Sequence, residues 1–409
     1  MSGELHRLAN GVTVAVDPMP GALSASVGVY TSVGSRSEPE ALGGLAHLVE
    51  HMVFKGAGSR DARGIAEAIE DVGGSLNAWT ARDQTVFHAR ILGPDMPLAL
   101  ELIADLVRAP TLDEGDLERE KQVILSELGE ALDQPDDLIH DHLFEATYAR
   151  QPLARPVLGR KPTIRAATVV DCRDWLTREY RPERIVLSAS GAVDPDQVLA
   201  LANALFGDLP PGAAPLVEPA RFTGGTRHDR RAHEQAHWAF ALPGVAADSA
   251  GAPALSLFTQ AVGGGMSSRL FQHLREDRGL AYSVYAWGQG FAETGLFAVN
   301  CATDRANAAE AMALARDIVA KAAEDLSQAE LDRARAQIEA GLLMSFETVQ
   351  GRADQMARSI EVFGRIMTSA QMVADLRDVD LAAARAAGQA LHVGPIAIAS
   401  IGSKLALAA

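Results

Sequence analysis

The sequence predicts an α+β protein of two homologous domains, each a mostly antiparallel sheet with helices packed on one face. A Pro/Gly-rich stretch over residues 207–215 divides the 409 residues into near-equal halves. The halves resemble each other, and each reads as a strand pair, a helix, further strands, long helices and a final strand. We therefore assign domains to residues 1–206 and 226–409, joined by a linker over 207–225, and leave the strand order open.

The elements of the first half follow from local patterns. Residues 12–16 and 73–80 read as strands, and the apolar run over 184–191 reads as the final strand. Residues 113–132 show the spacing of a long amphipathic helix. A short, largely buried helix is expected between Gly44 and Gly56, because five apolar residues recur there at helical spacing. These residues are Leu45, Leu48, Val49, Met52 and Val53.

That short helix carries the most informative segment of the chain, His47-Leu48-Val49-Glu50-His51. It reads H-x-x-E-H, the inverse of the H-E-x-x-H zinc motif. Two histidines at i and i+4 lie on one helix face about 6 Å apart along the axis, close enough to share a metal ion. Glu50 could reach a metal-bound water without being a ligand. The alternative is a helix with two solvated histidines and a glutamate, but such groups are costly on a buried helix unless something binds them.

A zinc site that performs chemistry usually has three protein ligands and one open position, so the motif lacks a ligand. The expected helix over residues 113–132 carries Glu120 and Glu127. Their separation is nearly two turns, so both carboxylates project from one face beside an apolar stripe. The alternative is that both are solvated residues flanking that stripe.

These residues together resemble the inverzincin metallopeptidases, the family of pitrilysin, insulin-degrading enzyme and the mitochondrial processing peptidase. The resemblance rests on the H-x-x-E-H segment, on the runs over residues 73–80 and 118–127, and on the stretch over 151–159. It covers nearly the whole chain, and the length is most similar to the processing-peptidase-like bacterial branch.

Carried over residue by residue, the resemblance implies that His47, His51 and Glu127 are the ligands of one Zn²⁺ per chain. Glu50 would be the general base, and Glu120 would orient a ligand histidine. The implied function is a zinc-dependent endopeptidase that hydrolyses peptides with metal-activated water. The alternative is a non-catalytic scaffold or partner subunit of a processing-peptidase-like complex, and such proteins typically lack part of the metal set.

The resemblance also identifies residues 73–80 as a substrate-binding edge strand. Asn77, Ala78 and Thr80 would contact a peptide that adds to this edge in an extended conformation. The alternative for Asn77 is a turn residue.

The second half lacks the metal site. Residues 396–402 match the final strand of the first half, and residues 331–333 match 117–119. In this comparison the two histidines and three glutamates of the candidate site are replaced. The residues opposite His47, Glu50, His51, Glu120 and Glu127 are Ser256, Thr259, Gln260, Ala334 and Gly341. These residues cannot form the same site, so one zinc per chain is expected.

The second half contains a different match, to an arginine–tyrosine pair that in the family faces the zinc and helps hold the substrate carbonyl. The resemblance assigns Arg275 and Tyr282 to substrate binding, and a guanidinium and a phenol suit a developing oxyanion. The alternative is that Arg275 pairs with Glu276 or Asp277 while Tyr282 packs in the core. Related clamshell enzymes of the family carry this pair in the second long half of a single chain, and the present chain equals one such half. We therefore expect a homodimer with shared sites in a closed chamber. A heterodimer with a related chain is the alternative.

Composition narrows the partners and the compartment. The hydrophobic content of 48% is ample for large cores, and the net charge of −16 disfavours nucleic acid and anionic membranes as partners. Cys172 and Cys301, the two cysteines, lie far apart, which fits a reducing compartment. We expect a cytoplasmic protein, because the given chain shows no signal or transit peptide and no membrane-spanning segment.

Overall fold

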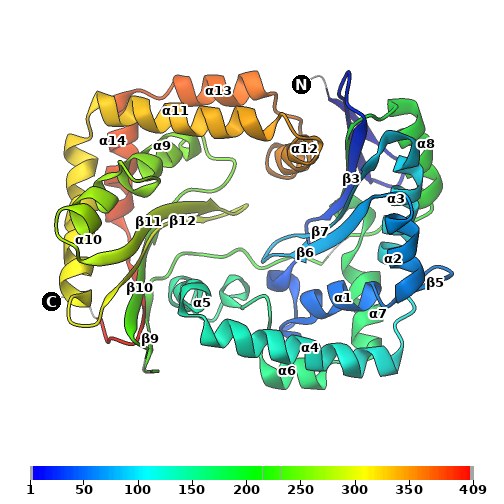
Figure 1. Ribbon diagram of the computed structural model, residues 1–409, viewed down its shortest axis with the longest axis horizontal. Helices are drawn as coiled ribbons and strands as arrows, with labels where there is room; N and C mark the ends of the chain where they lie inside the picture. Colours follow the sequence, from blue (N-terminus) through cyan, green and yellow to red (C-terminus); the bar gives the residue numbers. More distant parts are fainter. Residues whose placement is uncertain (1–2, 214, 232, 406–409) are drawn as a thin grey trace. The chain divides into compact units, whose positions relative to one another are not determined.

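The computed structural model describes residues 3–213, 215–231 and 233–405, and it confirms the predicted α+β architecture (Figure 1). The chain forms two compact units, and neither is continuous in sequence. The first unit takes in the chain up to Gly129, Arg155–Val217 and Leu343–Ser369. The second takes in Glu130–Ala154, Glu218–Leu342 and the chain from Ala370 onward. The assignment of domains to 1–206 and 226–409 treated each half as continuous, and the structure differs from it in this respect.

The first unit is built on a six-stranded sheet in the order β1-β2-β8-β3-β7-β6. All neighbouring strands are antiparallel except β2 and β8. The strands are β1 (Glu4–Arg7), β2 (Thr13–Pro18), β3 (Ser24–Thr31), β6 (Ser75–Thr80), β7 (Thr85–Leu92) and β8 (Ile185–Gly191). Strand β6 lies at one edge, as the sequence predicted for residues 73–80.

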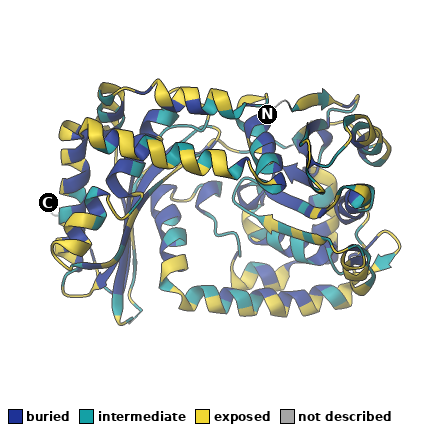
Figure 2. Ribbon diagram, turned by 45° about the horizontal axis from the view of Figure 1, so that its top comes forward, coloured by how far each residue is buried: buried dark blue, intermediate teal, exposed yellow. Residues whose placement is uncertain are grey.

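Most helices of this unit cover one face of the sheet, where valines of β2 and β3 pack against apolar residues of the helices. The helices are α1 (Leu45–Val53), α2 (Ala62–Glu70), α3 (Met96–Arg108), α4 (Glu114–Asp133), α6 (Lys161–Ala166), α7 (Val169–Glu179) and α8 (Pro195–Phe206). A short hairpin of β4 (Gly56–Ala57) and β5 (Arg60–Asp61) follows α1. The central strands β2, β3 and β8 are mostly buried, whereas the long helices carry an exposed stripe (Figure 2).

The opposite face of the first sheet is covered by a helix from the second half of the sequence, α12 (Val349–Phe363). Met356 and Ile360 of this helix pack against Tyr30 and Val186 of the central strands. Strand β3 is buried on both faces, and a strand buried on both faces needs cover on both sides. The sequence predicted helices on one face, and the helix on the second face comes from the other half of the chain.

The second unit repeats this plan with the sheet order β11-β12-β10-β13-β9. Its only parallel neighbours among the described strands are β13 and β9. The strands are β9 (Gly225–Asp229), β10 (Gln235–Pro243), β11 (Ala281–Gly290), β12 (Gly295–Asp304) and β13 (Ala397–Ile401). This order matches β6-β7-β3-β8-β2 of the first unit strand for strand, which supports the duplication inferred from the sequence.

The helices of the second unit mirror those of the first. One face of its sheet packs against α9 (Ala252–Gly263), α10 (Ala308–Asp325) and α14 (Leu381–Ala390). Helices α11 (Gln328–Ser345) and α13 (Ser369–Arg377) complete the second half. The other face is covered by α5 (Pro135–Thr147), which comes from the first half of the sequence. Each half therefore contributes one helix to the other unit. Among the described residues, no helix is both long and apolar enough to cross a membrane.

Candidate metal centre

Helix α1 presents the two motif histidines on one side. Leu48, Val49 and Met52 on its other side are fully buried in the core of the first unit, which fixes the rotation of the helix. The ring centroids of His47 and His51 lie 4.6 Å apart. The side chains are 14% and 19% exposed, so both rings remain accessible to a small ligand.

The start of α1 is held by Gly44 and Glu38. Gly44 has a φ of 93°, and a Cβ there would lie 2.9 Å from the Cα of Gly159, so a side chain does not fit. The buried Glu38 carboxylate accepts hydrogen bonds from the backbone N–H groups of Gly44 and Ala46, each at 2.8 Å. Burial raises the pKa of Glu38 to about 8, although these N–H groups and Arg155 act against the shift. The sequence contains no signal for Glu38, because it caps the helix from a preceding loop.

Helix α4 brings Glu127 to the two histidines. Its Oε2 atom lies 4.0 Å from His47 Nε2 and 3.7 Å from His51 Nε2. One ligand atom from each of the three residues lies within 4.8 Å of the others, and no other such group occurs in the described part of the chain. Burial lowers the pKa of His47 to about 4, assisted by the proximity of His51. The imidazole of His47 is therefore neutral near pH 7, as metal binding requires.

Glu120 lies behind His51 of this cluster. One carboxylate oxygen is 3.0 Å from His51 Nδ1, and the other accepts a hydrogen bond from Lys55 at 2.8 Å. Burial alone would raise the pKa of Glu120, but the hydrogen bonds from Lys55 and His51 outweigh it and lower the pKa. Sequence reasoning missed Lys55, which lies in the turn that follows α1.

Glu50 lies beside this cluster and is not one of its three members. Its Oε2 atom accepts a hydrogen bond from the Thr80 hydroxyl at 2.5 Å. Burial raises the pKa of Glu50, and the hydrogen bond from Thr80 offsets part of the shift. The carboxylate therefore lies next to the three candidate ligands in an environment that favours proton uptake.

Three of the five residues predicted to bind substrate lie on β6, which pairs only with β7 among the described strands. Asn77 is exposed, and its side-chain oxygen accepts a hydrogen bond from the N–H of Ala78. Ala78 is partly buried against the core. Thr80 points to Glu50, a contact that the sequence did not predict.

Arg275 and Tyr282 lie in the second unit. Arg275 is exposed at the end of a π-helical turn over Phe271–Glu276, and its guanidinium lies 4.9 Å from the ring centroid of Phe271. Tyr282 is 55% exposed on β11. The alternative in which Tyr282 packs in the core therefore does not hold.

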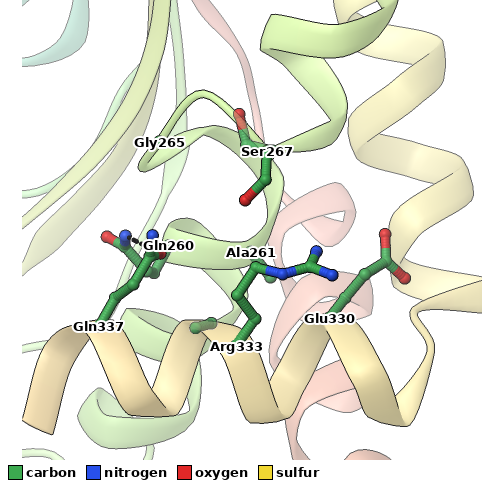
Figure 3. Close-up of a pocket in the computed structure, with 9 residues that line it drawn as sticks. Gln260, Ala261, Gly265, Ser267, Glu330, Arg333 and Gln337 are labelled. Atoms are coloured by element: carbon green, nitrogen blue, oxygen red, sulfur yellow. Dashed lines mark hydrogen bonds between the residues drawn. The ribbon is translucent and has the colours of Figure 1, made fainter.

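The second unit shows what replaces a metal site at the corresponding position, between α9 and α11. Gln260 donates a hydrogen bond to Gln337 at 2.8 Å, and Arg333 and Glu330 line the same crevice (Figure 3). A volume of about 10 Å³ remains, enough for about one water molecule. Two side-chain amides thus form a hydrogen bond with each other at the position where the first unit brings two imidazoles and a carboxylate together.

Comparison with known proteins gives the family. The family model described as Insulinase (Peptidase family M16) matches residues 13–161. The family model described as Peptidase M16 inactive domain matches residues 166–338. A Streptomyces coelicolor protein named an uncharacterized zinc protease is 35% identical over 91% of this chain and 83% of its own. YmxG of Bacillus subtilis, also named an uncharacterized zinc protease, is 30% identical over 96% of both chains.

Solved structures show the same fold. A peptidase M16 inactive domain from Pseudomonas fluorescens superposes with a TM-score of 0.92 and 23% identity over 100% of both chains. A protease from Helicobacter pylori superposes with a TM-score of 0.89 and 20% identity, over 98% of this chain and 99% of the other. By these sequence matches, the chain belongs to peptidase family M16, the insulinase or pitrilysin-type family of zinc proteases.

Proposed function

We propose that this chain is a zinc-dependent endopeptidase in which His47, His51 and Glu127 hold one zinc ion. The observation that carries the proposal is the convergence of these three donors from α1 and α4 within 4.8 Å. Two imidazoles and one carboxylate leave a position open for water, which is the donor set of catalytic zinc. When bound, zinc polarises the scissile carbonyl and lowers the pKa of a coordinated water toward about 7.

Glu50 is the general base in this proposal. Its carboxylate takes a proton from the attacking water and later delivers it to the leaving amine. Two features support this role: Glu50 lies beside the ligand cluster without belonging to it, and burial raises its pKa. Glu120 supports the cluster by bonding His51 Nδ1, which leaves Nε2 of the same ring for the metal.

The substrate is a peptide that adds to β6 as an extended strand. The outer edge of β6 faces no other strand among the described residues, and exposed Asn77 lies along it. Arg275 and Tyr282 of a partner subunit would complete the site, which implies a homodimer with shared sites in a closed chamber. Their exposure supports this role. A heterodimer with a related chain remains the alternative assembly.

The test is peptide hydrolysis by the purified chain, with zinc content measured on each variant. Glu50→Gln should retain zinc and lose hydrolysis, because the base is neutralised while the ligands remain. Glu127→Ala should lose zinc, and a chelator should abolish the wild-type activity. Normal turnover by Glu50→Gln would contradict the mechanism. A chain that binds zinc but cleaves nothing in a broad peptide library would favour the non-catalytic partner subunit.

A further inference from the structure

We propose that Thr80 is a positioning residue whose hydroxyl holds the Glu50 carboxylate in its working orientation. The inference rests on the proposed function, because it assigns a partner to the proposed base. It changes the role that the sequence predicted for Thr80, from contact with the substrate to control of the catalytic carboxylate.

The hydrogen bonds around Thr80 direct its hydroxyl proton to Glu50. The Thr80 Oγ1 atom lies 2.5 Å from Glu50 Oε2, and its other hydroxyl neighbour, Thr85 Oγ1, is 3.4 Å away. Thr85 uses its own proton to bond the backbone oxygen of Val33 at 2.9 Å. A hydroxyl can donate one hydrogen bond, and a carboxylate is a stronger acceptor than another hydroxyl. Thr80 therefore donates its hydrogen bond to Glu50.

The position of Thr80 is set by the sheet. Thr80 is the last residue of β6 and pairs with Thr85 of β7. The backbone oxygen of Thr85 accepts a hydrogen bond from buried Thr31 on β3 at 2.9 Å. Three strands thus fix the backbone beneath Thr80, and its β-branched side chain has few alternative rotamers. A group held on strands is positioned more tightly than one held on a loop.

This contact leaves the two oxygens of Glu50 with different tasks. Oε2 accepts the hydrogen bond from Thr80, so Oε1 is the oxygen that takes the proton from water. Without the hydroxyl, the carboxylate would rotate among several orientations, and fewer of them would be productive. Loss of positioning lowers kcat, whereas loss of a substrate contact raises KM, so the two roles of Thr80 can be separated.

The experiment compares Thr80→Val, which keeps the shape, with Thr80→Ser, which keeps the hydroxyl. Thr80→Val should lower kcat about 10- to 100-fold, the value of one hydrogen bond to a charged group, with KM and zinc content unchanged. Thr80→Ser should recover most of the loss. Ser188→Ala is the matched control, since its buried hydroxyl on β8 bonds the Ala353 carbonyl at 2.8 Å and takes no part in holding Thr80, and its kcat should stay near wild type.

Two results would overturn the inference: a Thr80→Val enzyme with wild-type kcat, or one whose loss lies in KM alone. If Thr80→Val fails the folding check by circular dichroism, Thr80→Ala replaces it against the same Thr80→Ser comparison. An undiminished Glu50→Gln enzyme would instead refute the proposed function, so the two failures are distinguishable.

Discussion

The contact between Glu120 and His51 provides a direct test of how the protein would tune the proposed metal site. In Glu120→Gln, the side chain keeps its length and loses its charge. In the wild-type protein, the buried Glu120 carboxylate bonds His51 Nδ1 at 3.0 Å and Lys55 Nζ at 2.8 Å. An amide can still accept one bond from His51, but it cannot pair with the Lys55 cation.

The expected loss follows from the strength of such bonds. A hydrogen bond to a charged group contributes about 1.5 to 3 kcal/mol, against about 0.5 to 1.5 kcal/mol for a neutral one. The neutral acceptor also leaves the His51 ring less basic, so its other nitrogen binds a metal more weakly. We expect zinc to bind about 10- to 100-fold more weakly, which corresponds to about 1.4 to 2.7 kcal/mol.

The assay is a zinc titration in competition with a chromophoric chelator, at a temperature where the variant is folded. Glu118→Gln is the matched control, because Glu118 lies on the same helix and its exposed side chain bonds Lys121 at 2.7 Å. It should bind zinc as the wild type does. Unchanged affinity in Glu120→Gln would refute the reasoning, and equal losses in both variants would indicate a general effect of charge.

Two further predictions concern the acid stability of the second unit and the assembly. Hydrogen bonds from Arg269 lower the pKa of Glu330 to about 2, so the pair stabilises the fold above about pH 4.5 and this contribution is lost as the pH falls toward 2. Arg269→Met should therefore lower the free energy of unfolding, measured with urea, by about 1 to 3 kcal/mol at pH 7 and by little near pH 2. An equal loss at both pH values would contradict this. Mixing Glu50→Gln with Arg275→Ala chains should restore about a quarter of wild-type activity, since half of the randomly formed dimers contain one intact site; no recovery with exchanging subunits would count against shared sites.

Sequence reasoning reached the fold class, the duplication and the position of β6 at a sheet edge. The first two follow from local periodicity and from matches between the halves, and the edge position of β6 follows from the family resemblance. The reasoning did not reach the exchange of α5 and α12 between the units. Both helices follow a long helix in their own half, and nothing in their periodicity says which sheet they cover. That choice depends on the apolar faces that the two sheets leave open.

The sequence by itself determined which side chains share a helix face, and the family resemblance then implied the ligand set. His51 is four positions after His47, and Glu127 is nearly two turns after Glu120, so helix geometry alone places each pair on one face. Only the tertiary structure decided how these groups are held. Glu38 bonds the start of α1 from a loop, and Thr80 bonds Glu50 from a neighbouring strand. Such contacts depend on packing between elements, because local spacing carries no information about which side chain a fold brings opposite another.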